Sequence, residues 1–193
     1  MGREFELKYA ADAAALAALQ VRFPDLCSIA METTYYDTPD RFLSSLRWTL
    51  CRRMENGVSV CTLKTPLPDG SRGEWEVCCG SIEEGIRMLS RSGAPEALLH
   101  HTAAGVEEVC GARFDRLAGP IKGDGFTAEL ALDRGMLLGG GRERPFMEVE
   151  VELKSGSDQA AAQFARQLAD EFGLKDEPKS KYRRALDLAK GER

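Results

Sequence analysis

The chain has 193 residues, of which 30% are charged and 43% hydrophobic, a composition typical of a water-soluble globular domain. Its formal net charge of −5 argues against a general nucleic-acid-binding protein, which would usually be basic. No stretch approaches the roughly 18 consecutive apolar residues of a membrane helix, and the charged N-terminal segment is unlike a signal peptide. We therefore expect one cytoplasmic domain over residues 1–193, with no membrane or nucleic-acid partner.

In the first half of the chain, helix and strand signals alternate. Asp12 is a predicted N-cap, because an alanine-rich run follows it as far as Arg22. Ser81 starts a capping box for a second helix that ends near Gly93. Asn56-Gly57 predicts a tight hairpin between the strands on either side. The strands predicted in this half are residues 29–36, 48–53, 58–64 and 73–79.

The second half begins with a short predicted helix after Pro95 and ends with two longer helices. Ser157 is a predicted cap for a helix that stops at Gly173, and a basic helix follows over residues 179–190. The triple glycine of residues 139–141 is interpreted as a connector, since no Walker-type lysine follows it. The strands predicted here are residues 107–117, 126–133 and 146–153. About eight strands joined largely by hairpins predict an α+β fold, an eight-stranded antiparallel β-barrel with flanking helices.

Six cysteines are present, and no two of them have Cys-x-x-Cys spacing. The two histidines, His100 and His101, fall in a predicted helical stretch, so no zinc site is expected. In the absence of a secretory signal we expect reduced thiols. The cysteines are Cys27, Cys51, Cys61, Cys78, Cys79 and Cys110.

Two segments place charged residues at alternating positions. The first carries Glu4, Glu6 and Lys8, and the second carries Glu148 and Glu150 followed by Glu152. In a strand such residues share one face, with apolar residues on the other. A solvated outer face is the commoner meaning of this pattern. Rows of like charge repel, however, and nearby cations or a bound metal would relieve the repulsion.

Basic residues occupy the corresponding face of the middle strands and of the final helix. Carboxylates bind hard divalent metals through oxygen, whereas guanidinium and ammonium groups bind phosphate oxygens. Together the two sets suit a polyphosphate chain with its metal. The basic residues are Arg53, Lys64, Arg116, Lys181 and Arg184.

These motifs, in this order, resemble the CYTH superfamily, also called the triphosphate tunnel metalloenzymes. Glu4-x-Glu6-x-Lys8 is similar to the family's ExExK signature. Further similar elements cover nearly the whole chain and are Tyr35-Tyr36-Asp37-Thr38-Pro39, Leu50-Cys51-Arg52-Arg53, Thr62-Leu63-Lys64, Arg72-x-Glu74, Leu132-Asp133-x-Gly135, Glu148-x-Glu150-x-Glu152 and Ser180-Lys181-x-x-Arg184.

The resemblance implies an eight-stranded tunnel that binds triphosphate and Mg²⁺ or Mn²⁺. It assigns Glu4, Glu6 and Lys8 as the catalytic set, in which Glu4 and Glu6 would bind the metal. Asp133 would be a further acidic member, or else a cap for a turn before Gly135. The other implied metal ligands are Glu148 and Glu150. Glu152 would lie beside them or at the mouth of the tunnel. The implied phosphate-binding residues are Lys8, Arg53, Lys64, Arg116 and Lys181; Arg184 would bind substrate or cap the last helix, and Arg72 and Glu74 would pair across the wall.

Cys51 departs from the family pattern, because the family usually has an arginine at this position. Strand alternation directs the neighbouring Arg52 outward, so substrate binding would be weaker or would rely on Arg47 or Arg113. Alternatively, a one-residue bulge would turn Arg52 inward.

The leading functional expectation is metal-dependent hydrolysis of a small triphosphate, inorganic tripolyphosphate above all. A class IV adenylate cyclase and a thiamine triphosphatase share the same tunnel and stay open, with Tyr35, Tyr36 and Trp48 as aromatic candidates. A module that binds polyphosphate or nucleotide without turnover also stays open, and Cys51 favours it. The oligomeric state is not determined, and a homodimer is among the options.

Overall fold

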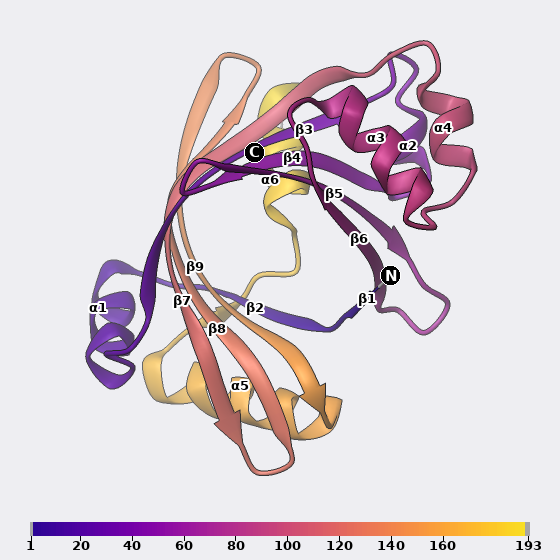
Figure 1. The fold of residues 1–193 in the computed structure, drawn as a ribbon. Coiled ribbons are helices and arrows are strands. Elements are labelled where there is room, and N and C mark those ends of the chain that lie inside the picture. The colour runs from indigo at the N-terminus through magenta and orange to yellow at the C-terminus, as the bar shows by residue number, and fades with distance from the viewer. Residues whose placement is uncertain (1, 192–193) are drawn as a thin grey trace.

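The computed structural model describes residues 2–191 and contains one antiparallel sheet of ten strands with helices on its outer side and at one end (Figure 1). The strands are β1 Gly2–Glu4, β2 Glu6–Ala10, β3 Cys27–Asp37, β4 Thr49–Glu55, β5 Val58–Pro66, β6 Arg72–Cys78, β7 Glu107–Gly123, β8 Phe126–Gly139, β9 Arg142–Gly156 and β10 Lys175–Asp176. The helices are α1 Ala13–Arg22, α2 Phe42–Ser45, α3 Ile82–Arg91, α4 Ala97–Thr102, α5 Asp158–Phe172 and α6 Lys181–Lys190. The predicted α+β class and antiparallel sheet are confirmed.

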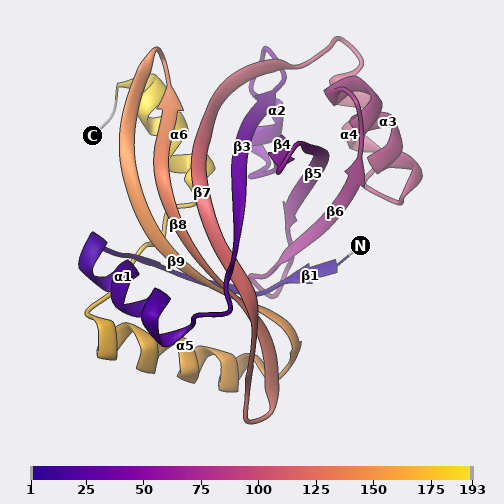
Figure 2. The same ribbon diagram turned by 60° about the vertical axis from the view of Figure 1, so that its left-hand side comes forward.

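The sheet differs from the expected eight-stranded closed barrel. Its hydrogen-bonded order is β1-β6-β5-β4-β3-β7-β8-β9-β2-β10, which is open. The N-terminal segment pairs first with β6 through β1 and then with β9 through β2, and only Phe5 separates the two strands. One continuous segment therefore crosses between the two ends of the sheet, as Figure 2 shows. The strand count rises to ten because this segment is split and because the two-residue β10 adds to β2.

Local signals account for the ends of most elements. The side chains of Asp12, Ser81 and Ser157 accept hydrogen bonds from the first turns of α1, α3 and α5. Asn56 and Gly57 both have positive φ, as a type I′ hairpin requires. The strands β7, β8 and β9 run several residues longer than predicted, because pairing in the sheet extends them beyond their apolar patterns.

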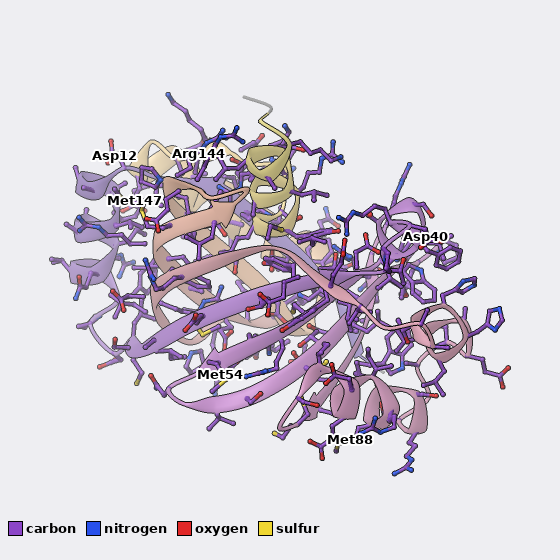
Figure 3. All side chains as sticks on the ribbon, turned by 90° about the horizontal axis from the view of Figure 1, so that it is seen from above. Asp12, Asp40, Met54, Met88, Arg144 and Met147 are labelled. Atoms are coloured by element: carbon purple, nitrogen blue, oxygen red, sulfur yellow. The ribbon has the colours of Figure 1, made fainter. Side chains whose placement is uncertain are left out.

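Two apolar cores lie on the outer side of the sheet, where alternate residues of the strands meet helices. Tyr9, Val149 and Val151 pack with α1 and α5, while Leu63 and Trp75 pack with α2, α3 and α4. Asp12 and Met88, at the start of α1 and on α3, lie on opposite sides of the molecule (Figure 3). The charged residues that alternate with these apolar ones consequently face inward. Among residues 2–191, no helix has both the length and the apolar character that crossing a membrane requires.

The last helix, α6, packs against β7, β8 and β9 through a separate core that includes Phe114, Leu137 and Phe146. At Gly139 the sheet approaches α6 so closely that an added Cβ would lie 2.3 Å from the Ala185 carbonyl oxygen. A glycine is therefore required here for steric reasons, and α6 is held at a defined position.

We expect Gly139→Ala to lower the free energy of unfolding by about 1–3 kcal/mol, because the methyl group would push α6 off the sheet. Urea denaturation measures this change. Gly2→Ala is the matched control, since a Cβ at Gly2 meets nothing within 4 Å. Equal stability of the two variants would contradict the close packing of α6.

Candidate active site

A cavity of about 900 Å³ is lined by side chains from every strand from β1 to β9 and from the start of α6. Most of its lining is charged, which distinguishes it from an ordinary apolar ligand pocket. Its basic residues are Arg3, Lys8, Arg53, Lys64, Arg72, Arg116, Lys154 and Lys181. Its acidic residues are Glu4, Glu6, Glu55, Asp69, Glu74, Glu76, Glu129, Glu150, Glu152 and Asp158.

Strand register brings opposite charges side by side. Arg116 on β7 lies opposite Asp133 on β8. Asp133 also lies opposite Glu148 on β9; this pair has like charges, and Lys181 contacts both of its carboxylates. On the other half of the sheet, Lys64 on β5 lies opposite Glu74 on β6. Directly opposed unlike charges stabilise antiparallel pairs, so the same register that aligns the strands also arranges the site.

At one end of the cavity, Glu4, Glu6 and Glu74 surround Lys64. The Lys64 ammonium contacts Glu4 Oε1 and lies 3.3 Å from Glu74 Oε1, whereas Lys8 Nζ lies 3.8 Å from Glu6 Oε1. Burial would lower the pKa of Lys64, but Glu4 and Glu74 outweigh burial and raise it. The second oxygen of Glu4 is buried and has no hydrogen-bond partner among the described residues.

Glu6 is the most strongly perturbed carboxylate of this group. Burial, followed by the negative charge of Glu150, raises the pKa of Glu6 to about 8, although Lys64 and Lys8 act in the opposite direction. A half-buried carboxylate with a raised pKa, next to a buried carboxylate oxygen without a hydrogen-bond partner among the described residues, would be stabilised by a bound cation. Glu4 and Glu6 could therefore hold a hard divalent metal.

A second acidic group consists of Asp133, Glu148 and Glu150. One oxygen from each lies within 4.8 Å of the others, a spacing that could also hold a metal ion. The ammonium of Lys181 lies among them, 2.7 Å from Asp133 Oδ2, 2.7 Å from Glu150 Oε1 and in contact with Glu148. Its charge is thus already shared by all three carboxylates.

Two arginines complete this group, which we call the Lys181 cluster (Asp133, Glu148, Glu150, Lys181, Arg116 and Arg184). Arg116 forms a bidentate pair with Asp133, with both N···O distances 2.8 Å, and lies 2.6 Å from Glu150 Oε2. Arg184 contacts Glu148. Burial raises the pKa of a carboxylate, but Lys181 and Arg116 outweigh it at Glu150 and hold that pKa well below its usual range.

The third charged group centres on Arg53. Its guanidinium lies 2.8 Å from Thr62 Oγ1 and 2.5 Å from Glu76 Oε1, and it contacts Glu55. Arg53 thus lines the cavity as predicted, but its charge is balanced by two carboxylates.

The bulge considered at Cys51 is wrong. Pairing of β4 with β3 and β5 is regular, so Cys51 faces the cavity and Arg52 faces outward, where its Nε donates to Ser59 Oγ. Neither Arg47 nor Arg113 lines the cavity. Burial raises the pKa of Cys51, so its thiol stays neutral and contributes no charge there.

Most of the site residues predicted from sequence come together in this cavity. Asp133 and Glu148 lie behind its surface, fully buried, and Arg184 lies beside Glu148 outside the lining. The turn that Asp133 was expected to cap does not exist, because β8 continues through Gly135 to Gly139. The residues that line the cavity as predicted are Glu4, Glu6, Lys8, Arg53, Lys64, Arg116, Glu150 and Lys181, with Glu152 also exposed to it.

Three basic lining residues were not predicted as part of the site. Lys154 continues the alternation of β9 and lies 2.8 Å from Glu152 Oε1, so the pattern could have revealed it. Arg72 was expected to pair with Glu74, yet its Nη2 donates to Thr49 Oγ1 at 3.1 Å. Arg3 reaches the edge of the cavity although alternation from Glu4 directs it outward; its side chain is 45% exposed and pairs with Asp69 and Asp158, which also belong to the lining.

Comparison with known sequences gives one family and a curated relative. The CYTH domain profile matches residues 2–186. The chain is 29% identical over 165 residues to an inorganic triphosphatase from Haemophilus influenzae, an alignment that covers 83% of this chain and 46% of that protein. The chain therefore spans about half the length of this relative.

Solved structures share the fold. A Bacillus halodurans protein provisionally assigned as an adenylate cyclase has a TM-score of 0.67 and 20% identity, with 93% of this chain and 96% of that chain covered. A provisionally assigned adenylyl cyclase from Hippeastrum, described as having dominant triphosphatase activity, has a TM-score of 0.68 and 16% identity, with 100% and 97% covered.

Proposed function

Because the chain belongs to the CYTH domain family, we propose that it hydrolyses a small triphosphate, with inorganic tripolyphosphate as its substrate and pyrophosphate and phosphate as its products. The observation that carries this proposal is the cavity of about 900 Å³, in which buried carboxylates and several cations face one another. An inorganic anion of high charge needs such a site and needs no apolar seat. The triphosphatase relative supports the same reaction class.

Glu4 and Glu6 are the proposed metal ligands. Two observations support this assignment: the buried oxygen of Glu4 that has no hydrogen-bond partner among the described residues, and the raised pKa of Glu6. A divalent ion held there, Mg²⁺ or Mn²⁺, would supply positive charge to phosphate oxygens and to an attacking water. The carboxylates would orient this charge toward the cavity.

Lys8, Lys64, Arg53 and Arg116 are the proposed phosphate-binding residues. All four line the cavity and come from four different strands, so they surround the space from several sides. Phosphoryl transfer depends mainly on positioning and on stabilising charge, so no protein nucleophile is required. Their present carboxylate partners would be exchanged in part for phosphate oxygens when substrate binds.

The alternatives that were left open receive less support from the cavity. Of the three aromatic candidates for an organic group, Tyr35 lines the cavity, but its ring packs against Tyr182 at 5.1 Å between centroids. Tyr36 and Trp48 belong to the outer core of α2, α3 and α4. A pure anion-binding module would be favoured by the neutral Cys51, but it would gain nothing from the carboxylates of Glu4 and Glu6.

We expect purified protein to release phosphate from tripolyphosphate in the presence of Mg²⁺ or Mn²⁺, and to stop when EDTA removes the metal. Parallel assays with ATP and thiamine triphosphate, including detection of cyclic AMP, measure the selectivity. Cyclic AMP formation from ATP would replace the proposal with a cyclase. Tight tripolyphosphate binding with no product from any substrate would identify a binding module.

A further inference from the structure

The two acidic groups of the cavity differ in how well they are neutralised. In the Lys181 cluster, three carboxylates meet three cations, and both oxygens of Glu150 are already bound, one by Lys181 and one by Arg116. The two oxygens of Glu148 contact Lys181 and Arg184, although Glu148 Oε1 makes no hydrogen bond among the described residues. At Glu4 and Glu6, one carboxylate oxygen has no partner among the described residues, and the nearest cation to Glu6 is 3.8 Å away. An added cation is therefore expected to be stabilised at Glu4 and Glu6 and not in the Lys181 cluster.

Lys181 is held in its position from several sides. Only 9% of its side chain is exposed, and its ammonium lies 5.1 Å and 5.7 Å from the ring centroids of Phe114 and Phe146. It is the first residue of α6, which is anchored against the sheet through Ala185 and Leu188. Moving the ammonium out of the cluster would leave three buried carboxylates with one fewer cation, which is costly.

We propose that Lys181 acts as a resident cation that takes the place of a metal ion between Asp133, Glu148 and Glu150, so that the protein has a single divalent-metal site, at Glu4 and Glu6. The inference rests on the metal dependence of the proposed function. It reassigns Asp133 and Glu148 from metal binding to the docking of α6 against the cavity. In the Lys181 cluster three cations already balance three carboxylates, so a divalent ion there would add excess positive charge. Around Glu4, Glu6 and Glu74 the cations among the described residues are Lys64 and Lys8, one fewer than the carboxylates.

The inference makes metal stoichiometry the decisive quantity. The number of Mn²⁺ ions bound per chain can be counted by titrating the protein with Mn²⁺ alone, with no triphosphate present. The electron paramagnetic resonance signal of free Mn²⁺ measures how much of the added metal stays unbound. Wild-type protein is expected to bind one Mn²⁺ per chain. Glu6→Gln is expected to lose this ion, whereas Asp133→Asn is expected to keep it.

Removing the resident cation should create a second site. Lys181→Met preserves most of the side-chain length, and we expect it to bind two Mn²⁺ per chain, with a larger rise in Tm on adding MnCl2 than the wild type shows. Lys179→Met is the matched control and should still bind one Mn²⁺ per chain, because the Lys179 side chain is 52% exposed and pairs with Asp187 outside the Lys181 cluster. If Lys181→Met does not fold, the Asp133→Asn titration still decides the question.

Three outcomes would overturn the inference. Two Mn²⁺ ions in the wild type, or loss of the single ion in Asp133→Asn, would mean that the Lys181 cluster binds metal. The proposed function would still stand in either case if phosphate release remained metal-dependent. No Mn²⁺ in the wild type, together with phosphate release that EDTA does not affect, would refute the metal dependence of the proposed function as well.

Discussion

Glu4→Gln should lower kcat/KM for metal-dependent tripolyphosphate hydrolysis by on the order of 10²- to 10³-fold, the loss typical when one preorganised electrostatic group is removed. Glutamine has nearly the same shape but no negative charge, so the site loses attraction for the metal while β1 keeps its packing. Glu4 is buried, and among the described residues one of its oxygens has no hydrogen-bond partner, so solvent cannot take the place of its charge. Phosphate release measured across a range of Mg²⁺ concentrations separates weaker metal binding from slower turnover.

Glu143→Gln is the matched control for this experiment. Glu143 lies on β9, its side chain is 54% exposed, and its contact with Arg113 is 3.8 Å long, so we expect unchanged turnover. Undiminished hydrolysis by Glu4→Gln at every Mg²⁺ concentration would show that the N-terminal segment does not hold the metal.

Arg116→Met should destabilise the fold by about 3–5 kcal/mol, because it leaves Asp133 and Glu150 with one fewer cation in a buried cluster. For a chain of this size that loss corresponds to a decrease in Tm of roughly 6–20 °C. Asp133 is fully buried, so water cannot replace the bidentate pair that it forms with Arg116. Thermal and urea unfolding followed by circular dichroism measure the change.

Arg113→Met, on the same strand, provides the comparison. The Arg113 side chain is 61% exposed, whereas that of Arg116 is 18% exposed. An exposed ion pair contributes little, so we expect a change within about 0.5 kcal/mol. If the two variants were equally mild, the Lys181 cluster would have no structural role, and Arg116 would be a substrate ligand alone.

Most of the helices and strands could be predicted because their signals are local. The caps at Asp12, Ser81 and Ser157 and the hairpin at Asn56-Gly57 act over a few residues, and all are present in the structure. The extra length of β7, β8 and β9 could not be predicted in this way, since their ends depend on pairing with neighbouring strands.

The sequence predicted which residues belong to the candidate site, but not which of them form ion pairs with one another. Alternation correctly directed Glu4, Glu6 and Lys8 to one face and Cys51 to the same cavity. It could not show that Asp133 and Glu148 lie beneath the cavity lining. Alternation predicts which face of a strand a side chain is on, but not how deeply that side chain is buried. Nor could it show that α6 inserts an ammonium among the carboxylates.

By itself, the sequence determined the antiparallel architecture, the charged inner face and the motifs that lead to the CYTH family, since these depend on strand period, turn chemistry and residue order. Only the tertiary structure decided that the N-terminal segment is split between β6 and β9, and that the Lys181 ammonium lies among Asp133, Glu148 and Glu150. The physical reason is that Coulomb interactions depend on the distance and burial of groups far apart in the chain, which strand register and the docking of α6 establish together.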